Sequence, residues 1–149
     1  MDNLTEEKRQ KVIDSSNIMM ERNIYSNGLR IYALEPFLDG KYYSDQSSFV
    51  CACFRSAGYD IPWMNVYAFR QSDLFETITV SDYNDIINKA KLADIIIFKS
   101  NMGIISSIRD KHVNIRIHQK EKNIPMTMSL SSIMKYKTKV VLKRFREFI

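Results

Sequence analysis

The stretch SDQSSFVCACFRSAG, residues 44–58, carries the clearest structural pattern in the chain. Its apolar residues recur at the spacing of one helical face, which predicts a helix from Asp45 to Ala57. The residues of that face are Phe49, Val50, Cys53, Phe54 and Ala57. Gly58 follows directly, and glycine commonly ends a helix because it adopts the left-handed conformation without strain. The stretch therefore predicts an amphipathic helix that buries one face in a core.

A further helix is predicted near the start of the chain. Thr5 can serve as its N-cap, and two glutamates follow in the first turn, where the helix dipole favours acidic side chains. Its predicted buried face consists of Val12, Ile13, Ser16, Met19 and Met20. We interpret the two methionines as core-filling side chains, since methionine usually fills gaps in packing. Residues 23–43 are irregular, with Asn-Gly and Asp-Gly turn signals.

The second half of the chain changes from helical to β-type patterns. Ser81 is the predicted cap of a short helix, whose apolar residues are Ile86, Ile87 and Ala90. Four later segments have the composition or alternation of strands: residues 92–99, 113–117, 126–130 and 138–142. This order predicts an α+β fold, in which N-terminal helices pack on a mostly antiparallel sheet formed by the C-terminal half. The length fits a single domain over residues 1–149.

Composition and charge limit the classes of protein to consider. The net charge of +5 favours anionic partners but does not by itself select any. Cys51 and Cys53 are one residue apart on the predicted helix and point in different directions, so they do not meet disulfide geometry. Two reduced thiols suit a cytosolic or phage-made protein better than a secreted one. Residues 1–11 have no apolar run and residues 95–98 are too short to span a bilayer, so we expect neither a signal peptide nor a membrane span.

Several sequence elements resemble those of one enzyme family. The stretch Ser44–Val50 and its continuation to Pro62 resemble the nucleophile helix of the NlpC-type cell-wall cysteine peptidases, which reads Asp-Cys-Ser-Gly/Ser-Phe-Val before an Ala-Gly and a Pro. Tyr25–Gly28 resembles their Tyr-x-x-Gly element. Leu92–Phe98 resembles their Pro-Gly-Asp-Leu-x-Phe-Phe strand, and Lys111–Ile117 resembles their His-Val-Gly-Ile-Tyr-Ile strand. The resemblance extends in order over nearly the whole chain and implies the papain-like NlpC fold.

The resemblance also implies a role for individual positions. In the family, a cysteine in the first turn of the helix gains thiolate character from the helix dipole, and a histidine on the facing strand exchanges its proton. Gln46 occupies the nucleophile position, His112 the base position and Tyr25 a possible oxyanion position. The residue that should orient the imidazole aligns with 124–126, where Pro125 cannot hydrogen-bond a histidine. Because a glutamine amide is not a nucleophile, the resemblance implies a domain that is inactive as sequenced.

Other positions have also diverged from the family pattern. Ala93 replaces a glycine that leads one strand, and Asn114, Arg116 and His118 replace glycine, tyrosine and glycine on the next. An experimenter who silences a cysteine changes that residue alone, so this wider divergence favours natural loss of activity over engineering at Gln46.

Three nearby residues are weak substitutes for the missing cysteine. Ser47 points about 100° away from the direction of position 46. Cys51 lies more than a turn into the helix, where the effect of the dipole has faded, and Cys53 lies on the apolar face. We therefore expect no working substitute.

These observations predict a degenerate peptidoglycan-hydrolase-like domain, acting as a structural or wall-binding component in the baseplate or hub of a phage tail or tail-like particle. The expected partners are peptidoglycan or another wall polymer and phage tail or baseplate proteins. The particle would be made in the bacterial cytoplasm and would carry the domain to the wall. The alternative is a peptidoglycan endopeptidase whose cysteine was replaced at Gln46 by engineering, or whose role another residue takes. We expect no cofactor, and no metal, because His118 has no partner at zinc-ligand spacing.

Basic residues cluster near the C-terminus: Lys135, Lys137, Lys139, Lys143, Arg144 and Arg146. Such a cluster can bind wall polymers, nucleic acid or an acidic protein. It can also be the solvated face of a strand, which we favour because no aromatic residues are interleaved on the basic face to stack on bases. A small nucleic-acid binder is therefore the least favoured class.

Overall fold

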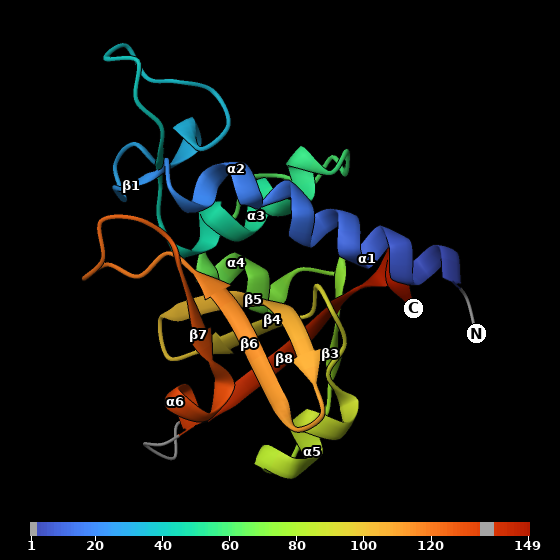
Figure 1. The fold of residues 1–149 in the computed structure, drawn as a ribbon. Coiled ribbons are helices and arrows are strands. Elements are labelled where there is room, and N and C mark those ends of the chain that lie inside the picture. The colour runs from blue at the N-terminus through green and yellow to red at the C-terminus, as the bar shows by residue number, and fades with distance from the viewer. Residues whose placement is uncertain (1–2, 135–138) are drawn as a thin grey trace.

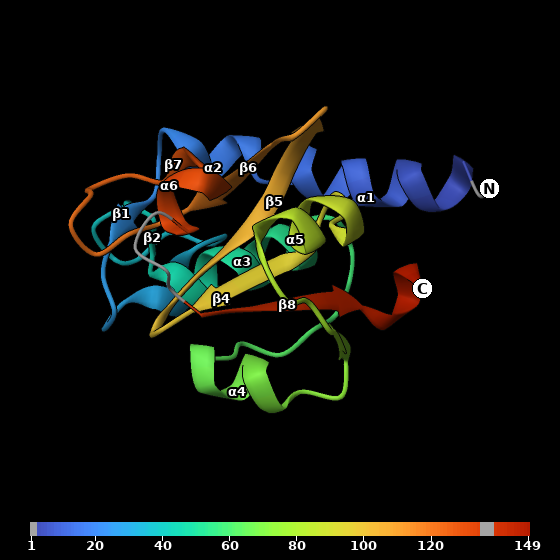
Figure 2. The same cartoon turned by 90° about the horizontal axis from the view of Figure 1, so that it is seen from below.

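The computed structural model of the chain describes residues 3–134 and 139–149 and contains helices on both sides of a sheet (Figures 1 and 2). The α-helices are α1 (Asn3–Ser15), α2 (Asn17–Met20), α3 (Gln46–Ser56), α4 (Val66–Gln71), α5 (Tyr83–Lys89) and α6 (Leu130–Met134). The strands are β1 (Ile24–Tyr25), β2 (Tyr43–Ser44), β3 (Phe75–Ile78), β4 (Ile95–Phe98), β5 (Asn101–Arg109), β6 (His112–Ile117), β7 (Met126–Ser129) and β8 (Val140–Phe145). Short 3-10 helices cover Arg30–Tyr32 and Arg146–Phe148.

Six of the strands form one antiparallel sheet in the order β3-β8-β4-β5-β6-β7. Strands β4 to β7 follow one another as neighbours, whereas β8 returns to lie between β3 and β4. The short strands β1 and β2 form a separate parallel pair. The predicted α+β class, with N-terminal helices and a mostly antiparallel sheet from the later part of the chain, is confirmed.

Strand β4 explains why the sheet needs two covering layers. Its side chains Ile95 and Ile97 pack in one core with residues of α1, α3 and α4, whereas Ile96 and Phe98 pack in a second core with residues of α5 and α6. All four residues are buried, as expected for a strand covered on both faces. Figure 1 shows α1 and α3 on one side of the sheet and α5 and α6 on the other.

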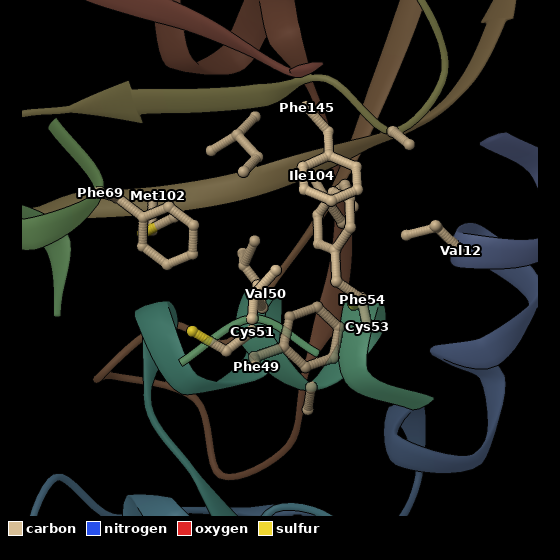
Figure 3. Close-up of a cluster of buried hydrophobic side chains, with 14 of the residues drawn as sticks. Val12, Phe49, Val50, Cys51, Cys53, Phe54, Phe69, Met102, Ile104 and Phe145 are labelled. Carbon is tan, nitrogen blue, oxygen red and sulfur yellow. The ribbon is translucent and has the colours of Figure 1, made fainter. Parts of the chain in front are cut away.

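Helix α3 provides the centre of the first core. Its Phe49, Val50 and Phe54 side chains are fully buried, and Phe54 points toward the sheet, where its ring centroid lies 5.1 Å from that of Phe145 (Figure 3). The helix begins with a capping box, in which the Asp45 carboxylate accepts from the Ser48 N–H and the Ser48 hydroxyl accepts from the Asp45 N–H. It ends before Gly58, which has a φ of 101°. The predicted helix and its buried face are confirmed.

Several predicted boundaries are corrected. Helix α1 begins at Asn3, so Thr5 lies inside it, and the N-cap of α5 is Asp82 while Ser81 hydrogen-bonds to Asp85. The strand predicted at 138–142 is β8, which begins at Val140 and continues to Phe145, and residue 138 lies outside the described residues. Strands β3 and β5 and helix α4 were not predicted.

Strand β4 is shorter than the predicted 92–99 because the chain turns just before it. The Asp94 N–H donates to the Lys91 carbonyl, and Ala93 has a positive φ of 68° inside this turn. Ala93 still donates to the Ile105 carbonyl of β5, and the residues before it turn away from the sheet. No helix in residues 3–134 or 139–149 has both the length and the apolar character needed to cross a membrane.

Candidate functional site

Gln46 is the first residue of α3, and its side-chain amide joins three elements. Its Oε1 accepts a hydrogen bond from the Tyr25 hydroxyl at 2.8 Å, and its Nε2 donates to Oδ1 of Asn101 at 2.8 Å. Tyr25 belongs to β1 and Asn101 is the first residue of β5. The structure therefore brings Gln46 and Tyr25 together as expected, with Asn101 as a third partner.

The positive end of the α3 dipole already has an anion beside it. Asp45, 2% exposed, accepts hydrogen bonds from the Ser48 N–H, the Ser47 hydroxyl and the Asn27 side-chain amide. The Arg30 guanidinium lies 3.6 Å from the same carboxylate. Because this carboxylate satisfies the helix N-terminus, a neutral amide at Gln46 fits the local electrostatics.

A cleft of about 220 Å³ opens beside the amide of Asn101. Its lining consists of Phe98, Lys99, Asn101, Gln119, Met128, Ser132 and Ile133. Two amides and one hydroxyl provide neutral donors and acceptors, and Lys99 adds a single cation. Together with the half-buried Gln46, this cleft offers groups that hydrogen-bond an amide-rich ligand.

The structure does not bring His112 to Gln46. His112 is exposed at the start of β6 and pairs with Arg109, the last residue of β5, whereas Gln46 contacts the first residue of that strand. Eight residue steps along β5 separate the two ends by roughly 26 Å. The expected shared cleft between Gln46 and His112 is therefore absent from the described residues, since Gln46 contacts one end of β5 and His112 pairs with the other.

The histidine near the tip of α3 is His118. Its Nε2 lies 3.0 Å from the Asn123 carbonyl, which can only accept, so Nε2 carries the proton and Nδ1 accepts from the Ser44 hydroxyl at 2.7 Å. Its ring lies edge-on to Tyr25, with centroids 5.3 Å apart. Burial lowers the pKa of His118, which keeps the imidazole neutral.

Ser44 and His118 have the contact of a nucleophile and a base, but neither is accessible. Both residues are 0% exposed, and the Ser44 oxygen also accepts a 3.3 Å hydrogen bond from the buried Asn23 amide. A substrate carbonyl cannot reach an oxygen enclosed in this way. The group is therefore a neutral buried network that connects β2 to Asn23, just before β1, and to the residues after β6.

The three residues considered as substitutes for a cysteine are all buried. The Ser47 hydroxyl donates to the buried Asp45 carboxylate at 3.2 Å and is thus engaged at the N-cap of α3. Burial raises the pKa of Cys51 to about 12, and burial also raises the pKa of Cys53. Neither thiol forms a thiolate at neutral pH, so neither supplies a nucleophile.

The position expected to orient a histidine also lies elsewhere. Pro125 is buried, and the following Met126 starts β7, where it pairs with Ile117 near the Asn101 end of the sheet. It therefore has no relation to His112. Within the described residues, no three His, Cys, Asp or Glu side chains gather as a metal site would require.

The C-terminal basic residues are largely engaged within the fold. Lys143 donates to the Arg70 carbonyl, Arg144 pairs with Asp94, and Arg146 donates to the Asp73 carbonyl. Lys135 and Lys137 lie outside the described residues. The described part of the cluster therefore serves mainly to connect β8 to its surroundings.

Asn101 and His118 are the residues of this site that sequence reasoning missed. A signal for Asn101 existed, because the apolar run after the turn at 99–100 marks a strand that was left unassigned. Comparison of the sequence with models of protein families gives no match, and a comparison with curated proteins gives none either.

Proposed function

We propose that the chain is a degenerate NlpC-type domain that binds peptide portions of the bacterial cell wall without cleaving them. One observation carries this proposal: at the tip of α3, where a cysteine peptidase of that family needs a thiolate, the Gln46 amide is hydrogen-bonded on one side to Tyr25 and on the other to Asn101. An amide in this position recognises another amide but cannot attack a carbonyl.

The contact with Asn101 supports a different alignment of the resemblance. The strand facing Gln46 reads Asn101-Met102-Gly103-Ile104, which stands where the family has His-Val-Gly-Ile. Gly103 suits this position because a Cβ atom there would lie 2.9 Å from the Arg116 carbonyl oxygen. With this alignment both the nucleophile and the base positions hold amides, which supports a binding role over catalysis.

The cleft beside Asn101 is the proposed binding surface. Its amides from Asn101 and Gln119 and the Ser132 hydroxyl match the alternating donors and acceptors of a peptide. Lys99 is exposed at the rim and can pair with a free carboxylate of a stem peptide. The expected role in a phage tail or tail-like particle rests on the family resemblance, and in that setting the particle delivers the domain to the wall.

Sedimentation with insoluble peptidoglycan tests the binding role. We expect the wild-type protein to co-sediment, and we expect Ser132→Trp to weaken binding because the indole fills the cleft. Ser131→Trp is the matched control, since this neighbouring serine on α6 is also exposed but does not line the cleft. Equal co-sedimentation of the two tryptophan variants would contradict the proposed surface.

Zymography on the same cell wall tests the loss of catalysis. We expect no clearing by the wild type and none by Gln46→Cys alone, because Asn101 cannot accept a proton as histidine does. The double variant Gln46→Cys with Asn101→His restores a thiol and an imidazole at contacting positions. Clearing by the wild-type protein would overturn the proposal of an inactive domain.

A further inference from the structure

The hairpin of β5 and β6 extends beyond both of its neighbours. On one side, the last backbone hydrogen bonds between β5 and the β4 segment join Ile105 to Ala93 and Asp94. On the other side, β7 pairs with β6 only from Asn114 onward. Among the described residues, positions 106–113 are therefore a two-stranded ribbon, and such a ribbon has an edge available for pairing.

The backbone of Ile108 points to this free edge. Arg109 and His112 flank a two-residue turn and form the closing pair, which in such hairpins exchanges hydrogen bonds between the strands. Because the pattern alternates, the next pair, Ile108 with Val113, is a non-hydrogen-bonded pair. The N–H and C=O groups of Ile108 thus face away from β6.

A groove of about 510 Å³ runs along this edge. Its walls come from α1, from the turn before β4 and from β5, through Glu6, Gln10, residues 90–92 and residues 106–109. Helix α1 lies on one side of the β5 edge, and the turn before β4 lies on the other. A single extended peptide fits between them. The edge of a second folded sheet would clash with α1. The groove therefore selects a peptide strand over a second copy of the protein.

Charge defines the chemistry of this peptide. Lys91 and Arg109 line the groove, are exposed and make no ion pair within the described residues. Glu6, the acidic residue of the lining, has Arg9 as a partner at 3.7 Å. Within the described residues, the Lys91 and Arg109 side chains are therefore available to pair with acidic side chains of a bound peptide.

We propose that this groove binds an extended acidic segment of a partner protein, which adds as a strand along residues 106–109 of β5. Backbone hydrogen bonds to Ile108 give affinity, and Lys91 and Arg109 select acidic side chains. This site lies on the ribbon end of the sheet and is independent of the proposed cell-wall binding.

Fluorescence anisotropy with defined peptides tests the proposal. The probe is a fluorescein-labelled peptide of about eight residues, long enough to span the edge, in which valine and glutamate alternate. We expect the wild-type protein to bind it, and we expect a version with N-methylated backbone amides to bind about tenfold or more weakly, since methylation removes the donors. Equal affinity for the two peptides, or no binding of the parent peptide, would overturn the proposal.

Charge reversal tests which end of the molecule is used. The double variant Lys91→Glu with Arg109→Glu should reduce affinity about tenfold or more. Its matched control is Lys120→Glu with Lys122→Glu, which reverses two exposed charges at the opposite end of β6. A larger loss with the control pair would place the peptide elsewhere and contradict the groove. Slower exchange of the Ile108 amide on peptide addition would support strand addition independently of any variant.

Discussion

Buried polar groups secure the two ends of strand β4 by different means. At its start, the fully buried Asp94 receives two hydrogen bonds from Arg144, at 2.8 and 2.9 Å, and the Arg9 guanidinium lies 3.7 Å away. At its other end, beyond Phe98, the Gln46 amide and the buried pair of Ser44 and His118 make hydrogen bonds between neutral groups. The N-cap Asp45 adds one ion pair there, with Arg30 at 3.6 Å. We call the first the ionic end, because a buried carboxylate between two guanidiniums holds it, and the second the neutral end, because the hydrogen bonds of Gln46 and His118 join neutral groups.

The difference matches what each end holds in place. Arg9 also donates to the Phe148 carbonyl at 2.6 Å, so the ionic group anchors α1 and the C-terminal segment to the same strand. Figure 1 shows the start of α1 and the C-terminal segment on the same side of the molecule. Removing one partner of a buried ion pair leaves an uncompensated charge and lowers the unfolding free energy strongly. Removing one partner in a neutral network costs less, because only a hydrogen bond is lost. The two ends should therefore respond differently to substitution and to pH.

The largest expected effect is at the ionic end. Asp94→Asn removes the counter-charge of two buried guanidiniums and should lower the free energy of unfolding by about 3–5 kcal/mol, measured by urea denaturation. Asp60→Asn is the matched control, because this carboxylate is fully exposed beside Arg55 and its loss should leave stability unchanged. A similar small effect for both variants would remove the distinction between the two ends.

Features that depend on residues close together in the sequence could be predicted, and features that depend on residues far apart could not. The helix observed over 46–56 was predicted over 45–57, with Gly58 at its end, because apolar periodicity and a terminating glycine are properties of a single segment. Strand β5 was missed because its outer half alternates weakly and its partner strands lie on both sides of it in sequence. Local pattern does not determine which strands pair.

The candidate site shows the same limit. Gln46 and Tyr25 were placed correctly beside each other, but the choice of His112 over His118 depended on which strand meets the helix tip. Both histidines border or follow β6, six residues apart, so both fit a strand motif in sequence. His112 is exposed and His118 is buried, and this difference follows from how the strands pair.

Replacing each histidine sharpens the comparison. His118→Phe leaves the buried Ser44 hydroxyl and the Asn123 carbonyl without their partner, so it should cost about 2–3 kcal/mol of unfolding free energy at pH 8. His112→Phe changes an exposed side chain and should leave stability unchanged. Equal effects in urea denaturation would mean that the buried network contributes nothing to stability.

Acid should weaken the end of the sheet that holds His118. Burial lowers the pKa of His118 in the folded protein, so the unfolded chain binds a proton more readily at mildly acidic pH. Stability from this residue is therefore present above the unfolded pKa of about 6.5 and is lost as the pH falls below it, by up to about 1.4 kcal/mol per unit. Urea denaturation at pH 7.5 and pH 5.5 measures the loss. The His118→Phe variant should show a smaller dependence on pH and His112→Phe an unchanged one, whereas identical profiles for both variants would contradict this account.

The smallest expected effect is at the tip of α3 itself. Gln46→Ala removes the hydrogen bonds to Tyr25 and Asn101, but both of those residues are only half-buried, so water can replace the lost amide. Alanine also suits the first turn of a helix, and we expect a loss of about 0.5–1.5 kcal/mol in unfolding free energy.

Gln71→Ala provides the control for this substitution, since Gln71 is exposed at the end of α4 and should show no loss. A loss at Gln46 as large as that at Asp94 would make the amide a structural support of the fold. The glutamine would then be explained by stability alone, and its contact with Asn101 beside the cleft would no longer argue for binding. A small loss together with weaker sedimentation on peptidoglycan would instead separate the two roles, because the amide would then matter to the ligand and hardly to the fold.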